Sequence, residues 1–175
     1  LKNYSPKGIL SVSSVLSLEA LPSTDILEIL SEALSLKKKT EYGESIQLKN
    51  NPSVALITSN RLGASRLAFE VAASSLGANS ITLPIGGSNI DSFLSTPESV
   101  KAISKLGISA FFVGTLMKKD AFTLSESLKS LSVVNACIDD GPVIALASLL
   151  TVYEHKGRLS GTKACFLGNV TKHEN

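Results

Sequence analysis

The chain has 175 residues, of which 43% are hydrophobic and 18% charged, with a mean hydropathy of +0.23. This composition excludes a disordered chain, which needs low hydrophobicity and high net charge, and no apolar run approaches the roughly 20 residues of a membrane-spanning helix. A net charge of only +2, an aromatic content of 5% and the lack of Trp argue against nucleic acid as a partner.

Apolar residues at helical spacing predict a first helix over residues 24–38. Beyond it, short apolar segments bounded by turns alternate with helical patterns. Strands are predicted over residues 54–57, 81–83, 108–113, 133–136 and 164–167. Helices are predicted over residues 65–76, 97–106, 121–131 and 142–155. This alternation predicts an α/β fold in which a parallel sheet carries helices on both faces and is joined by right-handed crossovers.

The two cysteines, Cys137 and Cys165, lie in separate apolar segments and lack the paired spacing of zinc sites. We expect both to be buried, reduced thiols of an intracellular protein, in the cytoplasm or the mitochondrion. His155 and His173 are isolated, and Asp140 is interpreted as a helix cap rather than a metal ligand. No metal site and no cofactor are therefore predicted.

Ligands of open parallel sheets bind beyond the carboxyl ends of the strands. The first such loop leads into a helix whose opening amides, near Gly63, Ala64, Ser65 and Arg66, form a site for an anion, with Arg61 also beside it. These residues predict a small anionic ligand. The prediction is general, because every helix that follows a strand in this fold class presents its positive end at the same edge.

Two long segments resemble the aspartate and ornithine carbamoyltransferases. Residues 55–78 are similar to the first strand and helix of that family's carbamoyl-phosphate domain. Residues 145–161 are similar to the helix that connects this domain to the amino-acid domain. The resemblance covers essentially the whole chain and implies a carbamoyl-phosphate-like domain over residues 1–160 and the first strand of a second domain over residues 161–175. It does not separate the aspartate branch from the ornithine branch.

The family's ligand-binding motifs are altered in this sequence. In its S-T-R-T-R loop, Ala64 stands where an arginine contacts the phosphate, and Arg66 matches an arginine with a more structural role. Gly114 replaces an arginine at the end of the third strand. The H-P-x-Q motif, whose His and Gln hold the carbamoyl group, has Gly141 and Ile144 at those two positions.

Each charge-assisted hydrogen bond contributes about 1.5–3 kcal/mol, so these changes are expected to weaken substrate binding by several kcal/mol. The resemblance therefore favours a catalytically degenerate homologue that acts as a structural, assembly or regulatory subunit rather than as an enzyme. The alternative is an active aspartate- or ornithine-type carbamoyltransferase, or a related transferase, whose rebuilt site uses Arg61, Ser65, Arg66 and backbone amides. A third possibility is a binding module for another small anion.

The resemblance also implies partners. Because the family builds trimers, we expect a homo- or hetero-oligomer, with identical copies, an active paralogue or a larger complex as partners. Neither nucleic acid nor insertion into a membrane is expected.

Overall fold

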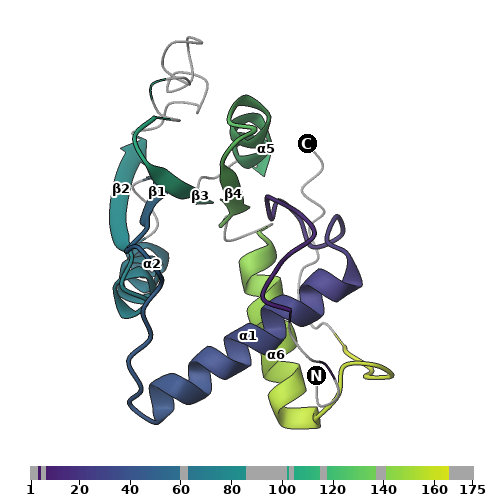
Figure 1. Cartoon of the computed structure of the whole chain (residues 1–175). Helices are drawn as coiled ribbons and strands as arrows, with labels where there is room; N and C mark the ends of the chain where they lie inside the picture. Colours follow the sequence, from purple (N-terminus) through teal and green to yellow (C-terminus); the bar gives the residue numbers. More distant parts are fainter. Residues whose placement is uncertain are drawn as a thin grey trace.

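The computed structural model describes residues 4, 7–59, 63–85, 102, 105–114, 118–136 and 141–165 (Figure 1). Within them, a four-stranded parallel sheet has the strand order β2-β1-β3-β4. The strands are β1 (Ser53–Ser59), β2 (Asn79–Ile85), β3 (Ile108–Gly114) and β4 (Ser132–Asn135). The helices are α1 (Ser23–Glu41), α2 (Gly63–Ser75), α5 (Lys118–Ser127) and α6 (Pro142–Lys156). The predicted α/β fold is confirmed.

The two faces of the sheet are covered by different helices. Alternate residues of a strand point to opposite faces. Ile57 and Phe111 point to one face, where they are fully buried with Leu124 of α5. On the other face, the ring of Phe112 packs against Phe69 of α2, with ring centroids 4.9 Å apart. The chain leaves β1 and β3 in opposite directions along the sheet, so crossovers of one hand place α2 and α5 on opposite faces.

The segment that precedes α1 extends the sheet beyond β4. The Val15 N–H donates to the Val133 carbonyl, and the Asn135 N–H donates to the Val15 carbonyl, both over 2.8 Å. Asn135 is fully buried, and its side-chain amide donates to the Leu16 carbonyl over 3.0 Å. The exposed hydrogen-bonding groups of an edge strand are thereby covered by the chain itself.

Two buried carboxylates of α1 hold the earlier part of this segment. Asp25 accepts hydrogen bonds from the backbone and the hydroxyl of Ser11, over 2.9 and 2.8 Å. Glu28 accepts from the Tyr4 hydroxyl over 2.7 Å and from the Lys7 backbone over 3.0 Å. These bonds, that of Tyr4 first, lower the pKa of Glu28 below its ordinary 4.5. The first turn of α1 is therefore an attachment point for the N-terminal segment.

The structure also corrects and delimits several predictions. Cys165 is exposed, contrary to expectation, because the described chain beyond α6 runs over the surface without a strand to cover it. Ala164, the other described residue of the predicted last strand, is likewise outside any strand. Cys137, His173, residues 166–167 and most of the predicted helix over 97–106 lie outside the described residues. None of the described helices is long and apolar enough to cross a membrane.

Replacing Glu28 with Gln should lower the melting temperature at neutral pH, because an amide is a weaker acceptor than a carboxylate for the Tyr4 and backbone donors. A depressed pKa means that the ionised carboxylate stabilises the fold above pH 4.5, and that this contribution disappears as the pH falls through the lower native pKa. The difference between wild type and Glu28→Gln should therefore shrink on acidification. Circular dichroism melts across the acid range measure it.

Glu32 provides a matched control, since it is exposed on the same helix. Its replacement by Gln should leave the melting temperature close to that of the wild type at every pH. A Glu28→Gln effect that is independent of pH would contradict the ionic origin of the stabilisation.

Candidate anion-binding site

The sheet order defines a topological switch point at the carboxyl ends of β1 and β3. These adjacent strands are followed by connections that leave in opposite directions, and open parallel sheets bind ligands at such a switch point. Thr58 of β1 lies opposite Gly114 of β3, and its hydroxyl donates a long hydrogen bond, 3.5 Å, to the Gly114 carbonyl. The candidate site at this switch point, which we call the crevice, therefore comprises the end of β1, the start of α2 and the end of β3.

The start of α2 supplies the positive end of this crevice. Helix geometry leaves the first N–H groups of α2 without partners inside the helix, and the macrodipole adds partial positive charge there. Gly63 and Ala64 are exposed and Ser65 is half-buried, and the first turn contains no acidic residue. The structure thus places these three predicted residues together beyond β1. Arg61, also predicted there, lies outside the described residues.

Arg66 is directed away from the start of the helix. Its Nε donates to Oε1 of Glu70 over 2.9 Å, and the same oxygen accepts the hydroxyl of Thr82 in β2 over 2.8 Å. These two bonds, that of Arg66 first, lower the pKa of the Glu70 carboxyl. Because Glu70 lies one turn closer to the C-terminus of α2, the Arg66 guanidinium joins helix to strand instead of extending toward an anion at the first turn.

The remaining predicted positions carry no side chain that can donate a hydrogen bond. Gly114 ends β3 and is buried. Gly141 is the buried N-cap of α6, in an extended conformation (φ −80°, ψ 143°), and Ile144 in the next turn is 51% exposed. Thr58 is a buried polar residue that sequence reasoning missed. Its signal in the sequence was a hydroxyl that directly follows the apolar residues 54–57 of β1.

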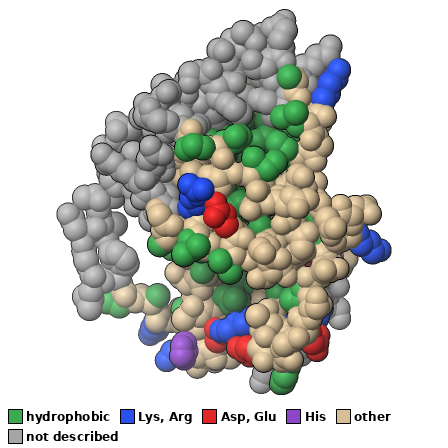
Figure 2. All heavy atoms as spheres, turned by 90° about the vertical axis from the view of Figure 1, so that its left-hand side faces the viewer, with side chains coloured by type: hydrophobic (Ala, Val, Ile, Leu, Met, Phe, Trp, Pro, Cys, Tyr) green, Lys and Arg blue, Asp and Glu red, His purple; other side chains and the backbone are tan. Residues whose placement is uncertain are grey.

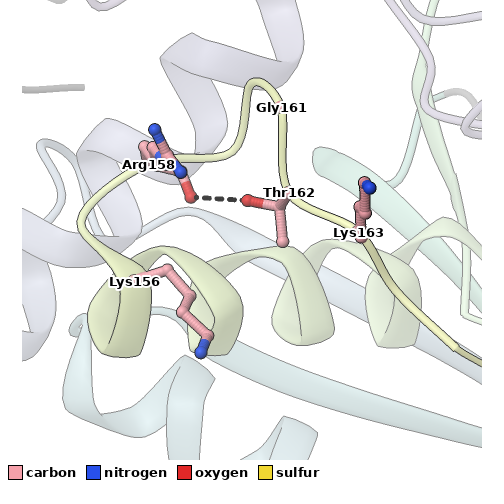
Figure 3. Close-up of a pocket in the computed structure, with 5 residues that line it drawn as sticks. All are labelled: Lys156, Arg158, Gly161, Thr162 and Lys163. Atoms are coloured by element: carbon pink, nitrogen blue, oxygen red, sulfur yellow. Dashed lines mark hydrogen bonds between the residues drawn. The ribbon is translucent and has the colours of Figure 1, made fainter.

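A separate hollow lies at the C-terminal end of α6. Its volume is about 560 Å³, and its lining contains Lys156, Arg158, Gly161, Thr162 and Lys163 (Figure 3). The Thr162 hydroxyl donates to the Arg158 carbonyl over 3.3 Å, which closes the turn. In Figure 3 the Lys156 side chain points to the other side of the loop from those of Arg158 and Lys163. Because Lys156 points away from the other two cations, the three side chains do not surround a single anion.

Nothing in the described part of the chain resembles a metal centre. His155, Glu154 and the other described candidates do not form any group of three or more His, Cys, Asp or Glu side chains. Glu154 instead pairs with Lys37 over 2.7 Å, which links α6 to α1. Asp140, the predicted cap, lies outside the described residues.

A parallel α/β sheet with a helix N-terminus at its switch point is an arrangement found in domains that bind small anions, and comparison with known proteins shows which family this domain belongs to. A family model described as "Aspartate/ornithine carbamoyltransferase, carbamoyl-P binding domain" matches residues 13–154. The chain therefore belongs to the aspartate/ornithine carbamoyltransferase family, within the part described as the carbamoyl-P binding domain. The family resemblance stated from the sequence is confirmed.

Individual relatives agree with this assignment. An ornithine carbamoyltransferase from Methanococcus aeolicus is 33% identical over 160 residues, which cover 89% of this chain and 50% of the relative. One from Hydrogenovibrio crunogenus is 27% identical and aligns with 91% of this chain and 53% of its own length. The chain thus spans about half the length of the curated relatives it matches.

Solved structures show the same fold at lower identity. The ornithine carbamoyltransferase from Thermus thermophilus superposes with a TM-score of 0.72 at 24% identity, covering 86% of this chain and 51% of that one. The catalytic subunit of M. jannaschii aspartate transcarbamoylase gives a TM-score of 0.70 at 23% identity, covering 84% of this chain and 48% of that one. Both likenesses support the fold alone.

The contact between Glu70 and Arg66 leads to a prediction about anion binding at the start of α2. Glu70→Gln keeps an oxygen for the Thr82 hydroxyl but removes the charge that holds Arg66, so the guanidinium becomes free to reach the start of α2. Inorganic phosphate should then bind more tightly than to the wild type, by about tenfold for one added charge-assisted hydrogen bond. Isothermal titration calorimetry with phosphate measures the change.

The double variant Arg66→Ala/Glu70→Gln is the control, since it lacks the released guanidinium and should lose the gain. A gain that persists in the double variant would mean that removal of the Glu70 charge, rather than Arg66, strengthens binding.

Proposed function

We propose that this chain binds carbamoyl phosphate at the start of α2, as the carbamoyl-phosphate half of an aspartate- or ornithine-type carbamoyltransferase. The observation that carries this proposal is the family match over residues 13–154. Ornithine carbamoyltransferases among the relatives favour the ornithine branch. Transfer activity, the acceptor amino acid and the partners belong to the proposal as well, because the chain spans only about half of each relative.

The crevice offers chemistry suited to the phosphoryl end of such a ligand. The exposed amides of Gly63, Ala64 and Ser65 can donate to phosphate oxygens, and the macrodipole of α2 favours the dianion. The Ser65 hydroxyl is a further donor, and Arg61 is the cation we assign to the phosphate. These groups also withdraw electrons from the phosphoryl group, which makes phosphate a better leaving group when an amine attacks the carbamoyl carbon.

A second candidate is the catalytically degenerate subunit, and a separate observation favours it. Gly114, Gly141 and Ile144 provide no side-chain donor, and Arg66 is bound to Glu70. Carbamoyl transfer needs its carbonyl oxygen polarised, and apolar or absent side chains cannot do this. Such a subunit would act through its partners, which we propose to be identical copies, an active paralogue or a larger complex.

Titration with carbamoyl phosphate separates the two candidates. Binding in the micromolar range supports the carbamoyl-phosphate site, whereas no heat at millimolar ligand supports the degenerate subunit. If the ligand binds, a colorimetric assay with ornithine or aspartate as acceptor then identifies the branch through citrulline or carbamoyl aspartate.

Ala64→Arg adds the guanidinium that the family's loop carries at this position. It should tighten carbamoyl phosphate binding by about tenfold or more, since one charge-assisted hydrogen bond contributes about 1.5–3 kcal/mol. Ala72→Arg is the matched control, because Ala72 is exposed two turns farther along the same helix. Equal effects of the two variants would place the ligand elsewhere than at the start of α2.

A further inference from the structure

Asp120 differs from the other buried polar residues of the described chain in its hydrogen bonding. Asp25 and Glu28 accept hydrogen bonds from the N-terminal segment. The side chains of Thr58 and Asn135 donate to backbone carbonyls. Asp120 is only 5% exposed, yet among the described residues no donor lies within hydrogen-bond distance of its carboxylate. Burial of a carboxylate without a donor is costly, so this group is suited to a ligand that brings the donor.

Asp120 lies in the first turn of α5, at the edge of the sheet where ligands of this fold class bind. α5 begins shortly after β3 ends at Gly114. Asp120 is one helical turn before Leu124, which is fully buried in the core, so the two side chains share the inward side of α5. Helical side chains lean toward the N-terminus of their helix. The Asp120 carboxylate therefore leans toward the carboxyl end of β3.

α5 and α2 border the crevice from opposite faces of the sheet. α2 follows β1 and α5 follows β3, and these two strands are adjacent. Adjacent strands are about 4.8 Å apart, so a molecule as small as carbamoyl phosphate can reach groups beyond both strand ends. Figure 2 shows the α2 side of the molecule, where hydrophobic and uncharged side chains predominate. Glu70, the acidic residue of α2, is already bound to Arg66 and Thr82. A carboxylate that can accept a ligand's hydrogen bond is therefore offered from the α5 side.

The start of α5 has the two kinds of group that a carbamoyl group needs. The carbamoyl NH₂ donates hydrogen bonds and the carbamoyl oxygen accepts them. The Asp120 carboxylate is an acceptor, and the first backbone N–H groups of α5 are donors without partners inside the helix. With the phosphate at the start of α2, the carbamoyl end of the ligand would extend toward this pair.

We propose that the Asp120 carboxylate accepts a hydrogen bond from the carbamoyl NH₂ and so selects carbamoyl phosphate over acetyl phosphate. Acetyl phosphate has nearly the same shape, but it carries a methyl group in place of the NH₂. A methyl group would leave the buried carboxylate without a donor, which is the basis of strong discrimination between such pairs. This assignment rests on the proposed function, because it requires a ligand whose phosphate lies at the start of α2.

Isothermal titration calorimetry with carbamoyl phosphate, acetyl phosphate and inorganic phosphate tests the assignment. The wild type should bind carbamoyl phosphate at least about tenfold more tightly than acetyl phosphate, since one charge-assisted hydrogen bond separates them. Asp120→Leu, which keeps a side chain of similar size without an acceptor, should bind the two ligands about equally. Inorganic phosphate has no carbamoyl group, so its affinity should be the same for the wild type and the variant.

Glu126→Leu is the matched control, because Glu126 is an exposed carboxylate on the same helix. It should keep the preference of the wild type. Asp120→Asn is the second variant, for use if the leucine variant does not fold. Its amide oxygen is a weaker acceptor than a carboxylate, so it should keep only part of the preference. Circular dichroism melts show whether each variant is folded.

Equal affinity of the wild type for carbamoyl phosphate and acetyl phosphate would overturn the role of Asp120 and leave carbamoyl phosphate binding intact. A folded Asp120→Leu variant with the full preference of the wild type would overturn it as well. So would a variant that loses inorganic phosphate together with the other ligands, since that result indicates a structural role. No heat with any of the three ligands would overturn the proposed function and the role of Asp120 together.

Discussion

Pairing of β1 on both of its edges is the constraint on which the rest of the structure depends. Ala55, Leu56 and Ile57 are almost completely buried, because α5 covers one face of this strand and α2 the other. A strand buried on both faces is a continuous apolar run instead of an alternating one. After β1 the chain adds β2 on one side, and it then adds β3 and β4 on the other side. The order in which strands are added therefore reverses at β1. The crevice between α2 and β3 follows from that reversal.

Carboxylates determine how the peripheral elements attach to this core. Glu28 and Asp25 hold the N-terminal segment on α1, and Glu70 joins α2 to β2 through Arg66 and Thr82. Glu70 has the wider consequence, because the guanidinium that it holds is the only predicted cation among the described site residues. Arg66 contributes to the attachment of α2, so the anion binding that we propose at the helix start would depend on backbone amides and on Arg61.

Sequence reasoning located the elements well, since their signals are local. The alternation of apolar strands with helical patterns predicted the correct parallel sheet, and Gly63, Ala64 and Ser65 lie at the start of the helix that follows β1, as expected. The contacts that decide the chemistry are not local. The choice of Arg66 between Glu70 and a ligand depends on Thr82 of the neighbouring strand, and the exposure of Cys165 depends on what packs over the chain beyond α6. No pattern along the sequence encodes either outcome.

Whether the crevice can hold a phosphate dianion depends on how much its backbone donors contribute. A helix N-terminus stabilises a nearby anion by about 0.3–1 kcal/mol at an exposed site, and by up to about 2 kcal/mol when partly buried. An arginine bond to phosphate adds about 1.5–3 kcal/mol for each bond made. A site without side-chain cations at Ala64 and Gly114 thus loses more than its amides provide. Tight binding therefore requires either Arg61 or a cation from another chain.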